Sequence, residues 1–543
     1  MKRIPFLGLG VQSGFPSVTA QSRINCYLEK VSDEETTSIV AYGMPCLESF
    51  TSLGGSPVRG MLTFGDYLYA VSADTVYRID SGGNAVSIGT ITSTYGRVGM
   101  ACNGSQILVV DGSASGWIYD LFLPKTCTIS NGTPTKISCA NHGFIAGSAM
   151  VFSTTGALPT GLTAGTTYYM VDIDDPNSFN VALTRGGTAI NTSDAGSGVH
   201  TINAVLAKIT ADGFPGGETA AFLDGYFVVN KPATGQYYVS GLYDGINWNA
   251  LDFASAESNP DNIIAVYADH GEIILFGPYT TEFVQNVGAQ DFPFSRAGSA
   301  CEVGLAARWT VCKMDSAVMF LGRNRMGETQ VYLLNGYTPQ RVSNSDIERI
   351  LNSYSSVSDA SAFSVMTNGH PMYILNVGGQ TWMYDMQTGC WSQLKGYGLE
   401  RYRGEIADVF GMSAVVADYE TGNIYRLKDT VYEDNGEPNI MSITGRHISS
   451  GLDRLRVYNL QADIEAGVGL STGQGDDPEI MLEISRDGGH SWGNPIIAKM
   501  GALGQYRTRA QWARLGAARD FTFRLSISDP VKRCILAVYG DVE

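Results

Sequence analysis

Short apolar runs separated by polar turns recur along this chain. In residues 315–334, DSAVMFLGRNRMGETQVYLL, a polar turn precedes the apolar run 318–321, and a second polar turn precedes the aromatic run 331–333. Two runs of about five residues joined by Gly and polar residues predict a β-hairpin and not a helix.

Seven copies of this hairpin pattern are visible. Apart from one long gap, their turns lie roughly 40–55 residues apart, which is the period of four-stranded propeller blades. The long gap, between 104 and 225, returns to this period if about 80 residues are removed as an insert. A long β-sandwich with irregular repeats is the alternative. The turn residues are Gly65, Gly104, Gly225, Gly271, Asp315, Gly369 and Gly411.

The pattern predicts an all-β protein: a β-propeller of about six or seven blades, with an inserted small β-barrel and a C-terminal β-sandwich. Residues 1–56 read as a lead-in that closes the ring of blades or contacts a neighbouring subunit, with a strand at 23–29. Residues 57–124 and 206–429 hold the blades, and the Thr-, Gly- and Asn-rich residues 125–205 form the insert. Longer alternating strands at 455–460, 480–484 and 521–527 place the sandwich in residues 430–543.

One short helix is predicted at 345–351. Ser345 and Glu348 have the spacing of a capping box, and Ile347, Ile350 and Leu351 fall on one face.

The composition and net charge of the chain argue against some classes of function. The chain has 543 residues, 44% of them apolar and 16% charged, with a formal net charge of −17. No cluster of Lys and Arg is visible along the sequence, which argues against a protein that grips nucleic acid through its phosphates. An acidic channel wall past which DNA slides is compatible with this charge, as is an ordinary acidic surface.

The nine cysteines are odd in number and form no CxxC pair, which favours buried free thiols and folding in a reducing cytoplasm. No apolar run reaches the length of a membrane-spanning helix, so we expect no membrane insertion.

One motif with a known turn geometry lies near the C-terminus. The segment 485–492, SRDGGHSW, matches an Asp-box hairpin, whose expected structural residues are Ser485, Asp487, Gly489 and Trp492. This motif resembles the Asp boxes of sialidases, which carry several such boxes on a propeller. A single box in the last domain is instead typical of a turn that does not touch substrate.

We predict no catalytic, cofactor-binding or metal site, and we do not expect the protein to be an enzyme. We expect two acidic groups, Asp172, Asp174 and Asp175, and Asp476 with Asp477, to lie in turns; the first group offers at most a weak cation site. The six histidines lie at least ten positions apart, and no HExxH, GxSxG or Walker motif is present.

Both ends of the chain resemble one family. The segments RINCYLE (23–29) and YGMPCL (42–47) resemble the opening of phage tail hub proteins, although Cys46 stands where that family usually has Gly. WARLGAARD (512–520), FRL (523–525) and SDP (528–530) resemble its C-terminal signature. Residues 1–124 and 206–543 therefore look like a nozzle, or packaged-DNA-stabilisation, protein of a short-tailed bacteriophage.

This resemblance implies a virion protein of the phage tail that is assembled in the host cytoplasm. It implies a homohexameric ring below the portal and adaptor proteins, with the tail needle or fibre proteins at the far end. Double-stranded DNA would pass through the ring without sequence-specific binding. A host-surface propeller that binds or cleaves glycans, similar to a tailspike or sialidase, is the alternative function.

The insert resembles a second family. Residues 142–144 (HGF), 154–162 (TTGALPTGL), 167–169 (TYY) and 186–190 (GGTAI) match an accessory β-barrel of many phage virion proteins. That barrel is similar to a non-catalytic part of ubiquitin-activating enzymes, so no ubiquitin chemistry is implied.

Overall fold

The computed structural model describes residues 2–4, 6–8, 19–32, 37–256, 261–451 and 453–543. The chain divides into two compact units, one formed by residues 53–305 and the other by residues 1–52 and 306–543. In the described residues, α1 (Ser345–Leu351) is the single α-helix, and the other elements are β-strands. The all-β prediction is therefore confirmed.

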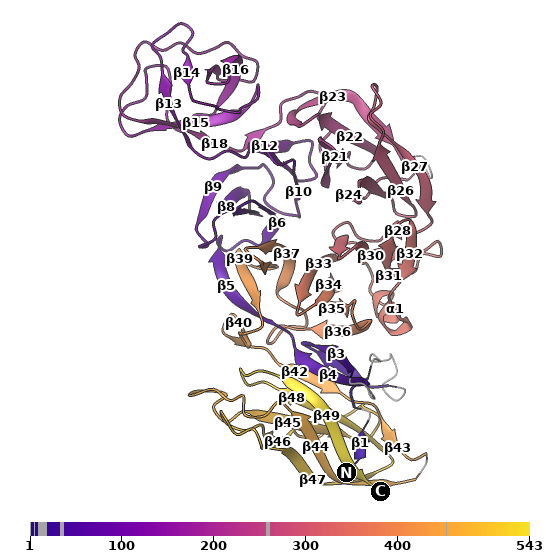
Figure 1. Ribbon diagram of the computed structural model, residues 1–543. Coiled ribbons are helices and arrows are strands. Elements are labelled where there is room, and N and C mark those ends of the chain that lie inside the picture. The colour runs from indigo at the N-terminus through magenta and orange to yellow at the C-terminus, as the bar shows by residue number, and fades with distance from the viewer. Residues whose placement is uncertain (1, 5, 9–18, 33–36, 257–260, 452) are drawn as a thin grey trace. The chain divides into compact units, whose positions relative to one another are not determined.

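Residues 53–305 contain four antiparallel sheets of four strands each (Figure 1). The strands of each sheet follow one another in sequence, except in the second sheet, where a barrel separates the third strand from the fourth. The sheets are β6 (Val58–Phe64), β7 (Tyr67–Ser72), β8 (Thr75–Ile79) and β9 (Ala85–Thr90); β10 (Gly99–Cys102), β11 (Gln106–Val110), β12 (Gly116–Asp120) and β19 (Ala207–Lys208); β20 (Ala220–Leu223), β21 (Tyr226–Asn230), β22 (Gln236–Gly241) and β23 (Asp244–Ser255); and β24 (Ala265–Asp269), β25 (Glu272–Phe276), β26 (Thr281–Asn286) and β27 (Phe294–Cys301). A short strand, β28 (Gly304–Leu305), ends this unit.

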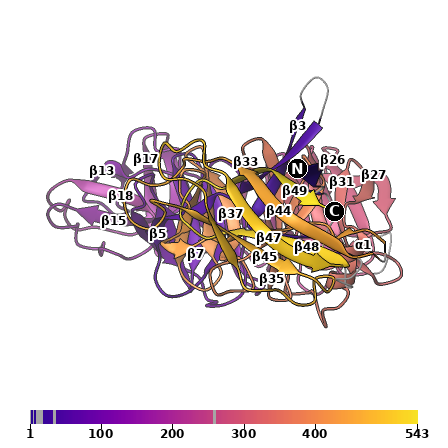
Figure 2. The ribbon, with the colours of Figure 1, turned by 90° about the horizontal axis from the view of Figure 1, so that it is seen from below.

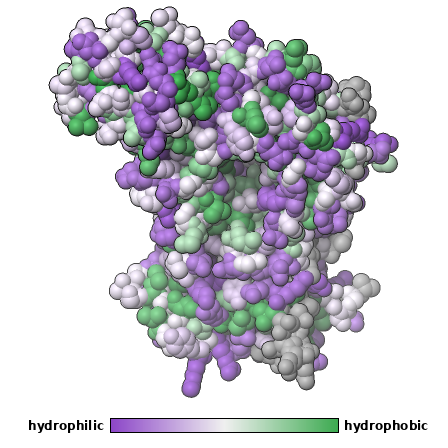
Figure 3. Space-filling model, turned by 45° about the horizontal axis from the view of Figure 1, so that its top comes forward, coloured by the Kyte–Doolittle hydropathy of each residue, from purple (hydrophilic) through white to green (hydrophobic). Residues whose placement is uncertain are grey.

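The inserted segment forms a closed barrel of six strands. Its core is hydrophobic and rich in aromatic residues, with Phe152, Tyr168 and Phe179 fully buried. Figure 3 shows the barrel, at the upper left, with small hydrophobic patches among hydrophilic residues. The strands are β13 (Lys125–Ile129), β14 (Ile137–Ser138), β15 (Ala149–Thr154), β16 (Tyr168–Asp175), β17 (Ser178–Ala182) and β18 (His200–Ala204).

The other unit adds three groups of four strands paired antiparallel, and the second group is part of a larger sheet. The last of them takes its outer strand from the beginning of the chain, because β5 pairs with β39. The strands are β29 (Cys312–Met314), β30 (Ala317–Arg323), β31 (Thr329–Asn335) and β32 (Thr338–Arg341); β33 (Ser361–Thr367), β34 (His370–Val377), β35 (Gln380–Asp385) and β36 (Cys390–Leu394); and β37 (Gly404–Phe410), β38 (Ser413–Asp418), β39 (Asn423–Lys428) and β5 (Cys46–Ser52). A small hairpin, β40 (Glu433–Asp434) and β41 (Glu437–Pro438), follows.

The turns that carried the repeat prediction have the expected backbone. All seven residues, from Gly65 to Gly411, have positive φ angles. That conformation is open to Gly and tolerable for Asp and Asn, which explains why these residue types mark the first hairpin of each sheet.

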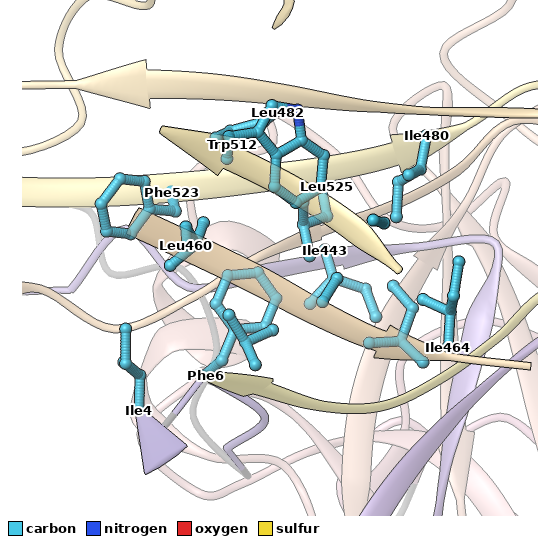
Figure 4. Close-up of a cluster of buried hydrophobic side chains, with 14 of the residues drawn as sticks. Ile4, Phe6, Ile443, Leu460, Ile464, Ile480, Leu482, Trp512, Phe523 and Leu525 are labelled. Atoms are coloured by element: carbon cyan, nitrogen blue, oxygen red, sulfur yellow. The ribbon is translucent and has the colours of Figure 1, made fainter. Parts of the chain in front are cut away.

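Residues 430–543, together with the start of the chain, form a sandwich of two sheets. Buried side chains from both sheets, among them Phe6, Leu460, Trp512 and Phe523, meet between them (Figure 4). One sheet has the order β3–β4–β49–β44–β47, with β1 on β49, and Figure 2 shows β44, β47 and β49 side by side. Its strands are β1 (Lys2–Ile4), β3 (Cys26–Ser32), β4 (Thr37–Gly43), β44 (Leu455–Ile464), β47 (Ala510–Ala518) and β49 (Cys534–Val542); the other sheet holds β2 (Ser22–Ile24), β42 (Met441–Thr444), β43 (Ile448–Ser449), β45 (Glu479–Ser485), β46 (Ile496–Lys499) and β48 (Asp520–Ile527).

Residues 1–56 are not a separate lead-in in the structure. They supply β1, β3 and β4 to the sandwich and β5 to the last four-stranded sheet. The strand expected at 23–29 is two strands, because Asn25 has φ 53° and breaks the extended backbone between β2 and β3.

The helix is present, but its N-cap was predicted wrongly. Asn344, not Ser345, caps α1, since its side chain accepts hydrogen bonds from the backbone N–H groups of Asp346 and Ile347. Glu348 instead pairs with Arg341 at 2.5 Å and accepts a hydrogen bond from Ser343.

Strand β2 makes one blade continuous with the sandwich. Ile24 pairs in parallel with Gln393 of β36 and antiparallel with Ser442 of β42. The sheet therefore runs without a break from β33 through β36, β2 and β42 to β46.

Some hairpin turns hold a residue other than Gly, Asp or Asn in the left-handed conformation, and Met412 is one of them. Met412, in the turn between β37 and β38, has φ 63° although it is not Gly, and its side chain is fully exposed. Met412→Gly is expected to raise the free energy of unfolding by about 0.5–1 kcal/mol, because it removes left-handed strain at a site with no packing to lose. Met412→Ala, which keeps the Cβ, is the control. A urea titration in which the two variants shift the midpoint equally would contradict this explanation.

Candidate functional site

The segments 23–29 and 42–47, which resemble the opening of hub proteins, converge where a blade meets the sandwich. Asn25 is the central residue, and it is only 3% exposed. Its Nδ2 donates to the carbonyl oxygens of Lys395 and Ile440 at 2.9 and 3.0 Å, and its Oδ1 accepts from the Lys395 N–H at 2.8 Å. Its backbone N–H donates to the Gln393 carbonyl, and its carbonyl accepts from Met44. One left-handed residue thereby joins three segments of the chain.

Two buried arginines complete the junction. Arg23 donates to the carbonyl oxygens of Trp391 and Gly8. Arg533 donates to the Asn439 side chain at 2.8 Å and to the Met44 carbonyl at 3.3 Å. Both guanidinium groups are thus solvated by carbonyl oxygens, and burial lowers the pKa of Arg23.

A buried carboxylate lies beside Arg533. Asp434 accepts hydrogen bonds from the Leu47 N–H at 2.9 Å and from the Asn439 side chain at 2.8 Å. Burial raises the pKa of the Asp434 carboxyl, while these hydrogen bonds and the nearby Arg533 charge act in the opposite direction.

A cavity of about 320 Å³ opens at this junction. The signature residues Tyr27, Glu29, Tyr42 and Pro45 line it from one side, and Arg533 from another. Burial raises the pKa of Tyr42, which lines the cavity, and that of the neighbouring Cys46 thiol, to about 12. The arrangement therefore suits packing and hydrogen bonding better than nucleophilic chemistry.

The Asp-box segment forms a closed turn after β45. Asp487 accepts hydrogen bonds from the backbone N–H groups of His490 and Ser491 and from the hydroxyls of Ser485 and Ser491. Ser485 also accepts from the Gly489 N–H at 2.8 Å. These hydrogen bonds hold the pKa of Asp487 far below its ordinary value. The half-buried Trp492 ring is covered by the Arg524 guanidinium, 3.8 Å from its centroid.

The other acidic candidates stay apart and lie at the surface. Asp174 pairs with Lys136 at 3.1 Å, and Asp175 caps the turn to β17 by accepting from the Asn177 N–H. Asp477 pairs with Lys499. Among the described residues, no group of three or more His, Cys, Asp or Glu side chains is placed to hold a metal ion.

Two histidine–carboxylate pairs were not foreseen from the sequence, because their partners lie far apart along the chain. His370 Nδ1 lies 3.0 Å from buried Asp385, and its ring packs on Tyr27. His447 Nδ1 lies near both Asp520 and the Thr522 hydroxyl. A catalytic triad places its carboxylate and nucleophile on opposite ring nitrogens, so the His447 arrangement does not form one.

All nine cysteines are free, and eight of them are buried, as predicted. None of the described helices combines the length and apolar character needed to cross a bilayer.

Comparison with known proteins shows which family has this architecture. A family model described as the β-propeller of bacteriophage P22 Gp10 matches residues 164–432, and a model of the β-sandwich of the same protein matches residues 443–543. Together the two models match more than half of the chain. A propeller and a sandwich joined in this order define a structural protein of a bacteriophage tail and so a component of the virion. The chain belongs to the family of the P22 tail hub protein.

An individual relative agrees with this assignment. The tail hub protein gp10 of Salmonella phage P22 is 21% identical over 332 residues, which span 57% of this chain and 67% of the relative. Solved structures with some likeness are the WD40 β-propeller domain of Doa1 and the computationally designed Ika8 protein, each 10% identical. They cover 70% of this chain and 96% and 99% of their own chains, with TM-scores of 0.35 and 0.33. These scores are too low to add to the argument.

The contribution of Asn25 to the stability of the junction can be tested by substitution. Asn25→Asp is expected to lower the free energy of unfolding by about 2–4 kcal/mol, because it removes two buried donors and places a negative charge against two carbonyl oxygens. Asn368→Asp is the matched control, since Asn368 is also left-handed but exposed, with a hydrogen bond to Tyr27. Its cost should stay within about 1 kcal/mol. Equal shifts in urea-unfolding midpoints would show that Asn25 does not hold the junction.

The hydrogen bonds of the Asp-box turn predict that the thermal stability of the protein depends on pH. Because folding depresses the pKa of Asp487, the carboxylate stabilises the fold fully above its ordinary value of 3.8, and this stabilisation is lost as pH falls further. Asp487→Asn should therefore have a lower Tm than wild type at pH 7, and the difference should shrink below about pH 3.8.

Asp541→Asn, which alters an exposed carboxylate on β49, controls for the general effect of charge on Tm. A Tm difference for Asp487→Asn that is constant from pH 7 to pH 3 would contradict the role of its ionised carboxylate.

Proposed function

We propose that the protein forms the nozzle, or hub ring, of a short phage tail, retains packaged DNA in the virion and forms the channel for its ejection. The observation that carries this proposal is the match of both the propeller and the sandwich to a tail hub protein. The junction supports it, because a protein loaded by a packaged genome needs its domains firmly joined, and continuous strand pairing through β2 joins them.

The charge distribution supports passage of double-stranded DNA without sequence-specific binding. Residues 53–305 contain 21 Asp and Glu but only 9 Lys and Arg. An acidic wall repels phosphates, so DNA can slide past without being held.

The proposed assembly is a homohexamer in the virion tail, formed in the host cytoplasm and without membrane insertion. Portal or adaptor proteins would contact one end of the ring, and tail needle or fibre proteins the other. A closed ring of identical subunits needs two different contact patches on each subunit. The sandwich and the strands from residues 1–56 are the proposed source of much of this contact.

We propose no catalytic role. The Asp-box residues Ser485, Asp487, Gly489 and Trp492 act as a structural turn, because the Asp487 carboxylate is occupied by the turn itself. The buried phenols and thiols at the junction stay protonated near neutral pH, which also disfavours nucleophilic chemistry.

Particles produced without this chain test the proposal. They are expected to package DNA and then lose it, so that full heads become rare, while addition of purified protein before DNA loss should preserve them. The fraction of full heads can be counted by electron microscopy, and released DNA by nuclease sensitivity. Full, stable particles that only fail to adsorb to the host would instead support a glycan-binding role and overturn DNA retention.

A further inference from the structure

Five exposed arginines converge on one end of β47, although three separate parts of the sequence supply them. Arg454 Nη2 donates to the Ala517 carbonyl at 3.4 Å, and Arg486 Nη2 donates to the Leu515 carbonyl at 2.8 Å. Arg456 lies opposite Ala517 in the strand register. Arg514 and Arg519 belong to β47 and the residue after it. The arginine edge is the set Arg454, Arg456, Arg486, Arg514 and Arg519.

Two carboxylates beside the arginine edge already have partners. Asp487 is bonded within the Asp-box turn, and Asp520 lies 2.9 Å from His447. In the part of the sandwich that the structure describes, the ion pairs are made by other cations, namely Lys499, Arg524 and Lys532. The edge thus presents concentrated positive charge on the outermost strand of its sheet.

Apolar side chains adjoin this charge. Trp512 of β47 donates its indole N–H to the Ile496 carbonyl at 2.8 Å, which brings β46 alongside β47. Ile496 and Ile497 of β46 are 43% and 55% exposed. Arginine next to exposed aliphatic residues is typical of a protein–protein interface, whereas a DNA-binding surface is more uniformly polar.

The distribution of charge along the chain indicates what kind of protein would bind the arginine edge. Residues 443–543 contain 12 basic and 12 acidic side chains and are neutral overall, whereas residues 53–305 have a formal charge of −12. A second copy of this chain therefore carries a surface complementary to the arginine edge.

We propose that the arginine edge of one subunit binds the acidic surface of residues 53–305 of the next subunit. This inference rests on the proposed ring, because such a contact joins two different patches and repeats around a closed assembly. The Asp-box turn has a part in it: by bonding Asp487 internally, it keeps that carboxylate from neutralising Arg486.

The test is the assembly of full-length Arg514→Glu/Arg519→Glu. Subunit association is followed by light scattering and electron microscopy across protein concentration, at low and high NaCl. The double variant should need about a 100-fold higher concentration to assemble, and wild-type assembly should weaken with salt. Arg507→Glu/Arg509→Glu makes the same charge change at exposed positions just before β47 and should assemble like wild type. Thermal unfolding of both variants verifies that they are folded.

Three results would overturn the inference. If the Arg514→Glu/Arg519→Glu variant assembles like wild type, the arginine edge is not the contact, although the ring itself stands. If wild type stays monomeric at every concentration, both the ring and the contact fail. If that variant assembles normally but loses binding to a short DNA duplex that the control still binds, the edge serves nucleic acid instead of a second subunit.

Discussion

The structure of residues 1–52 and 306–543 depends on one short strand that is paired along both edges. β2 has three residues, and it joins a propeller blade to the sandwich as neighbouring strands of one sheet. A flexible linker would let two domains move independently, whereas a shared sheet transmits force through backbone hydrogen bonds. Asn25 follows at once and turns the chain into the other sheet of the sandwich. A blade and both sheets are thereby fixed within five residues.

Buried polar groups make this joint specific. Arg23, Asn25 and Arg533 are each at most 5% exposed, and most of their donors meet backbone carbonyls or the Asn439 side chain. Hydrophobic contacts alone would tolerate small slips of one strand against another, but a buried guanidinium or amide whose acceptors move away loses its only solvation. The same logic explains the Asp box, where one carboxylate satisfies the backbone of a tight turn.

Local chemistry explains how much of the fold could be predicted from the sequence. Each first hairpin needs a left-handed turn, so Gly, Asp or Asn marks it, and the spacing of these residues revealed the repeats. The alternation of apolar and polar residues in the sandwich strands was also visible in the sequence. The role of residues 1–56 was not, because pairing between Thr51 and Ile424, or between Ile4 and Val538, leaves no trace in a local pattern.

The same limit applies to the functional residues. Asn25 was visible as part of a signature, but its contacts with Lys395 and Ile440 required the fold. The arginine edge could not be found in any window of the sequence, since residues 454, 486 and 514 meet only when β44, β45 and β47 lie together. Asn344 was missed for another reason: Ser345 also had a suitable neighbour three residues on, and the two caps compete locally.

The first strands of the chain have a consequence for its synthesis on the ribosome. β4 pairs with β49, and β5 with β39, so each of these strands must wait for a partner that is translated several hundred residues later. Until residue 534 has left the exit tunnel, the sandwich lacks its middle strand and β1 has no sheet to join. Closure of this sandwich therefore waits for β49, because the pairs that complete it join segments far apart along the chain.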